Sequence, residues 1–356
     1  MHILTGMTLE ELQAATGALE CERWRAKAML SWVYHRGAES LEAMTDLSPA
    51  LRARLAPSVA CRTTSLASRH TSPDGTTKFL IRLADGDAVE TVLIPDDTRR
   101  TICLSTQVGC PIRCVFCASG MNGLKRNLTS AEIVEQVLHV QRETDRPISN
   151  VVIMGIGEPL LNYDQVARAL SILNAPWGLG IGFHRITLST VGILNRLEGL
   201  LTAGIKPNLA LSLHAPNDAI RQRVVPTMPN VRVAQIVEAG RLYKARTRKE
   251  VTCEYVLLSG VNDAPEHAAE LAQLLRGSWL KVNLIPWNRV EELPYQEPPA
   301  ARAAAFAAVL KRAGVQVTLR KRKGDEVAAA CGQLRASWST PPGVVDRGAA
   351  AARELQ

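Results

Sequence analysis

Aromatic residues are scarce in this sequence, and long hydrophobic runs are absent from it. Phe, Trp and Tyr make up 4% of the 356 residues, which argues against an extended platform for stacking nucleic-acid bases. No apolar run approaches the roughly 20 residues of a membrane-spanning helix, and the first residues lack the layout of a signal peptide. We therefore expect a cytoplasmic protein that does not enter a membrane.

Basic residues and cysteines are more plentiful. The net charge is +8, and basic residues cluster at Arg241–Lys249 and Arg320–Lys323. Such clusters suit a phosphate backbone, although a solvated helix face explains a single cluster about equally well. The sequence has eight cysteines. Without a secretory signal, they are better interpreted as reduced thiols for metal or redox chemistry than as disulfides.

Three regions of predicted secondary structure follow one another. Residues 8–56 show helical patterns, and residues 76–84 and 88–94 flank Asp85-Gly86-Asp87, a turn typical of a β-hairpin. Strand-like apolar runs then alternate with helical stretches, one of which opens with the capping box Thr129-Ser-Ala-Glu132. These runs are Thr101–Leu104, Val151–Met154, Arg185–Ser189, Asn208–Leu213, Val251–Leu258 and Lys281–Ile285. The alternation predicts an α/β fold with a parallel sheet or a partial barrel.

Cys110, Cys114 and Cys117 form the most informative motif, a C-x3-C-x2-C loop directly after the first of these strands. Thiolates favour zinc or iron–sulfur clusters. A structural zinc site takes four protein ligands, so the zinc alternative needs a further residue such as Cys103 or His139. A four-iron cluster held by three cysteines leaves one iron open to a small molecule. The loop is therefore a candidate active site.

Further polar residues and glycines occur where other strands end. They are Gly155–Pro159 after the second strand, Ser189 at the end of the third, Ser212-Leu213-His214 at the end of the fourth, and Asn288 after the sixth. The ligand site of a βα barrel lies at the carboxyl ends of its strands, so these residues are expected to converge around the cysteine loop. Taken singly, each is equally well explained as a tight turn, a strand-end cap or a satisfied core histidine.

Glu90 interrupts a strand that is otherwise apolar on both faces. A buried carboxylate is costly unless it is paired. Glu90 is therefore either the partner of Arg82 on the facing strand, which the sequence alone slightly favours, or a base with a tuned pKa. The cysteines outside the loop have the simplest interpretation as buried apolar filler; these are Cys21, Cys61, Cys103, Cys253 and Cys331.

Several segments, taken in order, resemble one family. The three-cysteine loop and a Gly-Glu-Pro turn are similar to the radical S-adenosylmethionine (SAM) superfamily. The finer matches are Trp24–His35, Gln107–Pro111, Gly155–Asn162, Leu211–Asp218 and Ala329–Leu334. Together they resemble the RlmN/Cfr family of RNA adenine methyltransferases, and the N-terminal part is closer to the RlmN branch.

The resemblance implies a partial (β/α)6 barrel of the radical SAM type, with a small N-terminal helical domain and a β-hairpin extension. Its parts are expected as an RNA-binding helical domain at residues 1–60, the hairpin at 61–98, the barrel at 99–322, a segment with a methyl-carrier cysteine at 323–340, and a flexible tail at 341–356.

The resemblance also assigns cofactors. Cys110, Cys114 and Cys117 are implied to hold a [4Fe–4S] cluster, and its open iron to bind SAM. The residues that fall where the family contacts SAM are Gly157, Glu158, Ser189, Ser212, Leu213, His214 and Asn288.

Three more residues are implied to act on the substrate. Cys331 is the implied methyl carrier, Cys103 its partner in a transient disulfide, and Glu90 the proton acceptor. C2 and C8 of adenine are electron-poor carbons that cannot simply attack a methyl sulfonium. The family therefore works through a methyl-cysteine and consumes two SAM molecules per turnover.

The implied substrate is C2 of an adenine in 23S rRNA, with an adenine beside the anticodon of tRNA as a second one. A flavodoxin or ferredoxin is the implied electron donor, and a monomer the implied state. Alternatives are the C8-methylating branch, a radical SAM enzyme for another substrate, and a zinc-bearing RNA-binding module. Two departures from the family pattern, Glu326-Val327 and Val225–Asn230, bear on the geometry of the RNA target.

Overall fold

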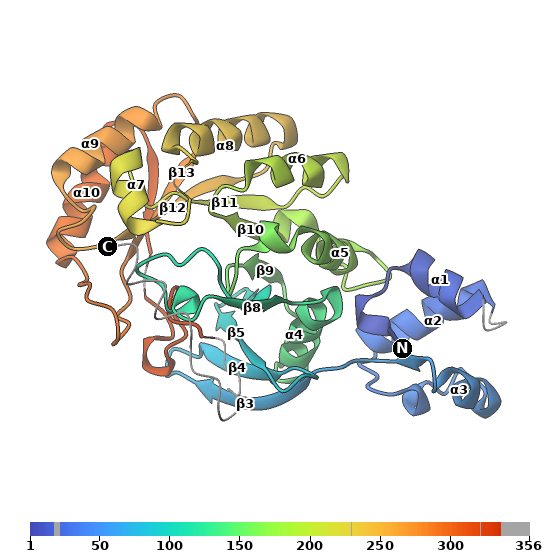
Figure 1. Ribbon diagram of the computed structural model, residues 1–356. Coiled ribbons are helices and arrows are strands. Elements are labelled where there is room, and N and C mark those ends of the chain that lie inside the picture. The colour runs from blue at the N-terminus through green and yellow to red at the C-terminus, as the bar shows by residue number, and fades with distance from the viewer. Residues whose placement is uncertain (18–21, 229, 321, 336–356) are drawn as a thin grey trace, which may run out of the picture.

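The computed structural model describes residues 1–17, 22–228, 230–320 and 322–335 (Figure 1). Its centre is a ten-stranded sheet with the order β14-β13-β12-β11-β10-β9-β6-β5-β4-β3. The strands from β6 to β14 pair in parallel. They are β6 (Arg100–Cys103), β9 (Asn150–Ile153), β10 (Ile186–Thr190), β11 (Asn208–Ser212), β12 (Val251–Leu257), β13 (Lys281–Pro286) and β14 (Gln316–Leu319). All six predicted parallel strands are confirmed, and β14 is an additional one.

The hairpin predicted from the Asp-Gly-Asp turn is also confirmed. Strand β4 (Thr77–Arg82) pairs antiparallel with β5 (Ala88–Pro95), and β5 pairs antiparallel with β6. A third antiparallel strand, β3 (Ser65–Thr71), forms the outer edge. The sheet ends at β3 on one side and at β14 on the other, so the expected partial barrel is open.

Helices lie on the outside of the curved sheet (Figure 1). Helix α4 (Ser130–Arg142) begins at the predicted capping box: the Glu132 backbone N–H donates to Thr129 Oγ1 at 3.2 Å, and the Thr129 N–H donates to Glu132 Oε2 at 2.8 Å. The others are α5 (Tyr163–Asn174), α6 (Leu194–Thr202), α7 (Asp218–Val224), α8 (Val233–Thr247), α9 (Pro265–Leu274) and α10 (Ala300–Arg312).

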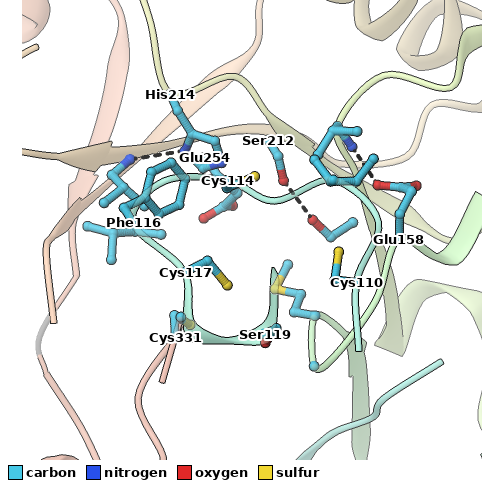
Figure 2. A pocket seen from close by; sticks show the side chains of 18 of the residues that line it. Cys110, Cys114, Phe116, Cys117, Ser119, Glu158, Ser212, His214, Glu254 and Cys331 are labelled. Atoms are coloured by element: carbon cyan, nitrogen blue, oxygen red, sulfur yellow. Dashed lines mark hydrogen bonds between the residues drawn. The ribbon is translucent and has the colours of Figure 1, made fainter. Parts of the chain in front are cut away.

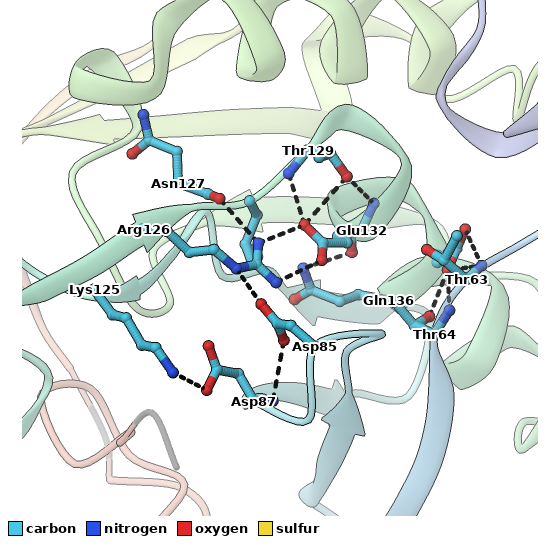
Figure 3. A network of polar contacts seen from close by, with 12 residues as sticks. Thr63, Thr64, Asp85, Asp87, Lys125, Arg126, Asn127, Thr129, Glu132 and Gln136 are labelled. Carbon is cyan, nitrogen blue, oxygen red and sulfur yellow. Dashed lines mark hydrogen bonds and ion pairs between the residues drawn. The ribbon is translucent and has the colours of Figure 1, made fainter. Parts of the chain in front are cut away.

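The hairpin turn is tied to α4 by a polar network (Figure 3). Arg126 donates from Nε to Asp85 Oδ2 at 2.6 Å and from Nη1 and Nη2 to the Glu132 carboxylate at 2.9 and 2.8 Å. Lys125 Nζ lies 2.6 Å from Asp87 Oδ1. Both cations belong to β8 (Leu124–Asn127), so the network fixes the antiparallel extension against the end of the cysteine loop.

The N-terminal part contains α1 (Leu9–Gly17), α2 (Arg23–Tyr34) and α3 (Pro49–Leu55), as predicted from the helical patterns. Two short strands, β1 (His2–Ile3) and β2 (Val59–Ala60), pair in parallel and bring the two ends of this part together. Among the described residues, no helix has the length and hydrophobicity needed to cross a membrane. Cys21 and residues 341–356 lie outside the described residues, and the expected domain boundaries stay predictions.

Candidate active site

The cysteine loop is clamped at its base by a two-stranded ladder. Strand β7 (Gln107–Gly109) pairs antiparallel with β8. The Cys110 N–H donates to the Gly123 carbonyl at 2.9 Å. Gly109 has φ +79°, and a Cβ there would lie 1.9 Å from the Gly123 oxygen. Only glycine fits this position, so the ladder closes tightly just before the first cysteine.

Apolar packing holds the rest of the loop. Phe116 is buried in a cluster with Trp287, whose Nε1 donates to the Phe116 carbonyl at 2.9 Å. Thr227 Oγ1 donates to the Ile112 carbonyl at 2.5 Å. These contacts come from the loops after β13 and after α7, so the barrel itself fixes the shape of the cysteine loop.

Cys110, Cys114 and Cys117 face one cavity of about 150 Å3 at the carboxyl ends of the strands (Figure 2). Burial raises the pKa of Cys110 to about 12 and also raises the pKa values of Cys114 and Cys117. Buried thiolates are costly unless a cation offsets their charge, and a bound metal supplies that charge.

The donor set fits a cluster better than a single ion. Among the described residues, no three His, Cys, Asp or Glu side chains lie close enough together to hold one metal ion. In a cubane each cysteine binds a different iron, so wider spacing is expected. The zinc alternative also loses a candidate ligand, because His139 lies 2.9 Å from Thr64 Oγ1 and does not line the cavity.

Gly157 and Glu158 line the same cavity, as predicted. Gly157 has φ +110°, and a Cβ there would lie 2.7 Å from the Gln107 Cβ, so the turn requires glycine. Glu158 accepts backbone hydrogen bonds from Val191 at 2.8 Å and from Leu160 at 3.1 Å. Burial raises the pKa of Glu158 to about 7. Its carboxyl group thus braces the ends of β9 and β10.

The predicted residues at the ends of β10 and β11 also meet in this cavity. Ser189 Oγ and Ser212 Oγ lie 3.2 Å apart (Figure 2). His214, with φ +56°, accepts at Nδ1 from the Val256 N–H at 3.2 Å. Burial lowers its pKa to about 3, so the ring is neutral and its proton lies on Nε2. Leu213, by contrast, packs in the main core and does not line the cavity.

Two buried charged residues near the site were missed by sequence reasoning. Arg221, 1% exposed, donates to the carbonyls of Val191, Ser212 and Leu213 at 2.5–2.8 Å. Burial lowers its pKa to about 10, so it remains a cation. Glu254 lines the cavity, and burial raises its pKa. Only the fold reveals them, because a charged residue in a helix or strand is usually exposed.

Cys331 lies on residues 324–335, which we call the C-terminal strap. It lines the cluster cavity together with Gly332. Asn288 Nδ2 donates to the Cys331 carbonyl at 2.9 Å, and the Ala118 N–H donates to the Gly332 carbonyl at 2.7 Å. Asn288, predicted as a SAM contact, therefore lies at the cavity and also holds the strap.

Cys103 and Cys331 share a second, smaller cavity of about 50 Å3. Both are free thiols. Burial raises the pKa of Cys103 to about 12. Arg320 lines this cavity and the cluster cavity, and attraction to Cys331, then to Glu254 and Cys103, raises the pKa of its guanidinium. The structure thus brings the two predicted working thiols together beside a cation.

Glu90 lies near the strap but lines neither of these cavities. The expected alternative of a pair with Arg82 is wrong: the partner is Lys78, whose Nζ lies 2.9 Å from Glu90 Oε1. The Arg335 N–H donates to Glu90 Oε2 at 2.7 Å. Lys78 and Arg82 both lie on the same sheet face as Glu90, on either side of Leu80, which pairs directly with Glu90. Arg82 is exposed, and Lys78 makes the contact.

Comparison with known families gives the class of protein. A model described as the radical SAM superfamily matches residues 104–272, and one described as a ribosomal RNA large subunit methyltransferase N-terminal domain matches residues 3–61. A crystal structure of a radical SAM methyltransferase from Sphaerobacter thermophilus superposes with a TM-score of 0.90 at 40% identity, over 94% of this chain and 99% of that one. The fold and the site thus define a radical SAM methyltransferase.

Relatives narrow the class to one family. A probable dual-specificity RNA methyltransferase RlmN of Rhodopirellula baltica is 48% identical over 88% of this chain and 85% of its own length. The dual-specificity RNA methyltransferase RlmN of Marinobacter nauticus is 42% identical over 93% of this chain and 92% of its own. The chain belongs to the RlmN family of radical SAM RNA methyltransferases, which use a [4Fe–4S] cluster and SAM. The expected family, fold class and cofactors are confirmed.

Proposed function

We propose that the protein methylates C2 of an adenine in 23S rRNA and of an adenine beside the anticodon in tRNA. The names of its relatives support RNA as the substrate and more than one target. The match of residues 3–61 to a ribosomal RNA methyltransferase domain favours the C2 branch over the C8 branch. The helical N-terminal part is the segment in which the sequence is closer to the C2-methylating RlmN branch.

One observation carries the proposal: Cys331 stands between the cluster cavity and Cys103. When bound, the cluster and SAM supply an electrophilic methyl group and a 5′-deoxyadenosyl radical. In this proposal Cys110, Cys114 and Cys117 hold the cluster. The proposed SAM contacts are Gly157, Glu158, Ser189, Ser212, His214 and Asn288, which line the cavity, and Leu213, whose side chain lies in the core and which contributes only its backbone.

Cys331 then serves as the one-carbon carrier, and its thiolate is the nucleophile. Arg320 lines both cavities that Cys331 lines on this side of the strap. Release of the product requires the thioether bond at Cys331 to break. Cys103 gives up its proton as it attacks Cys331 Sγ, and a disulfide forms. The electron pair of the broken carbon–sulfur bond passes to the carbon attached to the adenine, which takes up a proton to become the methyl group. An external dithiol must then return two electrons to restore both thiols.

Glu90 is the proposed acceptor of the adenine ring proton. Its carboxylate is paired with Lys78, and both side chains are largely buried. The Arg335 N–H occupies the other carboxylate oxygen. The strap must therefore shift at Arg335 before Glu90 can reach a substrate.

The test is to map methylated adenines in 23S rRNA and tRNA from cells with and without the gene. We expect 2-methyladenine in both RNAs to disappear with the gene and to return with the wild-type copy. Loss of 8-methyladenine instead would assign the C8 branch. Unchanged RNA would leave a radical SAM enzyme with another substrate. We also propose that flavodoxin or ferredoxin reduces the protein and that the protein is a monomer. A methylation assay reconstituted with each electron donor tests the first proposal, and light scattering tests the second.

A further inference from the structure

A third cavity, of about 550 Å3, also reaches Cys331. It lies between the end of the sheet at β13 and β14 and the C-terminal strap, and we call it the strap groove. The cluster cavity and the cavity shared with Cys103 measure about 150 and 50 Å3. Pockets that bind small molecules usually measure about 300–1,000 Å3. Of these three cavities at Cys331, only the strap groove falls within that range.

The walls of the strap groove differ in character. One side is aliphatic and includes Ile94, Ile285 and Leu319, the last of which is 40% exposed. The rim carries cations, with Arg322 and Lys323 beside Arg320. An aliphatic wall suits the flat face of a base, and Arg and Lys are the usual partners of phosphate oxygens. The two features together match a nucleotide.

The rim cations are held by contacts that an incoming phosphate can replace. Arg322 Nη2 lies 2.5 Å from Glu297 Oε2, and both side chains are partly exposed, at 34% and 46%. Lys323 Nζ donates to the Pro95 carbonyl at 3.1 Å. Exposed ion pairs contribute little to stability. Exchange of Glu297 for a phosphate therefore costs the fold little.

We propose that the strap groove binds the target adenosine nucleotide of the RNA. The base lies along the aliphatic wall with its edge toward Cys331, and the flanking phosphates lie at Arg322 and Lys323. An enzyme that modifies a base must take it out of the stack and hold it in a pocket. This proposal rests on the function proposed above and adds to it the place where the RNA enters.

The other basic cluster serves as a matched control. Arg241–Lys249 covers the end of α8, which leads into the amino end of β12 and so lies opposite the active-site rim. Arg241 is paired with Glu238 and Arg246 with Glu198. Loss of charge there changes the net charge of the protein equally but leaves the strap groove intact.

The experiment measures binding of a fluorescent RNA hairpin with one unpaired adenosine to the holoenzyme, across a range of KCl concentrations. The Arg322→Gln/Lys323→Gln variant is expected to raise Kd about 10-fold or more. The slope of log K against log salt is expected to fall by about 1.4, at about 0.7 for each phosphate contact on a single strand. The Arg241→Gln/Lys249→Gln variant is expected to keep the wild-type Kd and slope.

A second variant, Arg322→Lys/Lys323→Arg, retains both charges and is expected to bind RNA with a Kd within about 3-fold of wild type. All variants are expected to have the wild-type melting temperature, which checks that they fold. Wild-type Kd and slope in the Gln/Gln variant overturn the groove proposal, and so does an equal loss in the control. If the groove variants lose binding but the wild type transfers no methyl group to any RNA, the proposed function fails and the groove stands.

Discussion

The cysteine loop and the C-terminal strap hold their cysteines in different ways. The loop is clamped by the β7–β8 ladder and is packed against large buried side chains such as Phe116 and Trp287. The buried apolar anchors of the strap are mostly small, Ala329 and Ala330, with Leu334 as the largest. Its other contacts are hydrogen bonds, such as the one from Ser119 Oγ to the Leu334 carbonyl at 2.7 Å, and the ion pair of Arg335 with Glu292.

This difference suits two tasks. A radical-generating site must hold its groups rigidly, and large buried side chains provide that because cores are close-packed. A carrier cysteine must react in turn with a methyl donor, a substrate and a second thiol. Each hydrogen bond contributes only about 0.5–1.5 kcal/mol, so the strap, which has no large buried aromatic anchor, can be released one contact at a time. We infer that the loop is fixed and that the strap moves.

The largest expected effect separates the two regions chemically. Cys114→Ala is expected to remove most of the iron, of which about four atoms per chain are expected, together with all activity. Cys331→Ala is expected to retain the iron and SAM cleavage but to lose methyl transfer to RNA by at least ~10³-fold, as loss of a nucleophile does. Iron analysis and transfer of labelled methyl groups measure both.

Cys61→Ala, in the N-terminal part, provides the control and is expected to behave as wild type in both assays. Full RNA methylation by Cys331→Ala would refute the carrier role. Equal loss of iron in the Cys114 and Cys331 variants would remove the distinction between loop and strap.

The next effect concerns how firmly the carboxyl ends of β10 and β11 are held beside the cluster cavity. Arg221→Met removes the donor of three buried carbonyl hydrogen bonds, and it is expected to lower the free energy of unfolding by about 3–5 kcal/mol. Urea unfolding measures this directly. Arg221→Lys keeps the charge but cannot span the three carbonyls, so an intermediate loss is expected. If the free energy of unfolding of Arg221→Met changes by less than about 1 kcal/mol, Arg221 does not hold the ends of β10 and β11 firmly.

A smaller effect is expected from pH. The pKa of His214 is about 3 in the folded protein and about 6.5 when unperturbed. Between these values the unfolded state binds more protons, so stability falls as the pH falls from 6.5 toward 3. Thermal unfolding of wild type and His214→Asn from pH 7 to pH 4 tests this. We expect a flatter profile for the variant, and parallel profiles would contradict the assignment.

The smallest effect is expected at the end of the strap. Arg335 forms an exposed ion pair with Glu292, and such pairs contribute about 0–1 kcal/mol. Arg335→Ala keeps the backbone N–H that bonds Glu90, so the free energy of unfolding is expected to change by less than about 1 kcal/mol. A loss as large as that of Arg221→Met would show that the strap is as firmly fixed as the loop.

The strands that the sequence predicted correctly are those with buried apolar runs, such as β12. The two strands of the ten-stranded sheet that it missed form the edges of that sheet. Strand β3 reads Ser-Leu-Ala-Ser-Arg-His-Thr and is largely exposed, and β14 is short and also largely exposed. Such strands carry at most a short apolar pattern because they have little to bury, and pairing with a neighbour defines them.

The site shows the same division. Cys110, Cys114, Cys117 and Glu158 belong to loops after strands, where spacing and barrel geometry predict convergence. The roles of Lys78 and Arg221 could not be predicted, because each depends on a partner from another element. Side-chain partners of this kind follow from tertiary packing, which no local pattern records.

Glu135 of α4 joins the N-terminal part to the rest of the protein through a fully buried carboxylate. Its fully buried carboxylate accepts from Thr5 Oγ1 at 2.5 Å and from the Thr64 N–H and Oγ1 at 2.8 and 2.6 Å. These threonines lie on either side of the paired strands β1 and β2. Entry to and exit from the helical part therefore meet at one joint. A recombinant chimera that exchanges this part between relatives has to preserve this carboxylate and its threonines. It also has to preserve the contacts with α4 and α5, such as the hydrogen bond from Ser130 Oγ to the Gly6 carbonyl at 3.0 Å and the ion pair between Arg168 and Glu11.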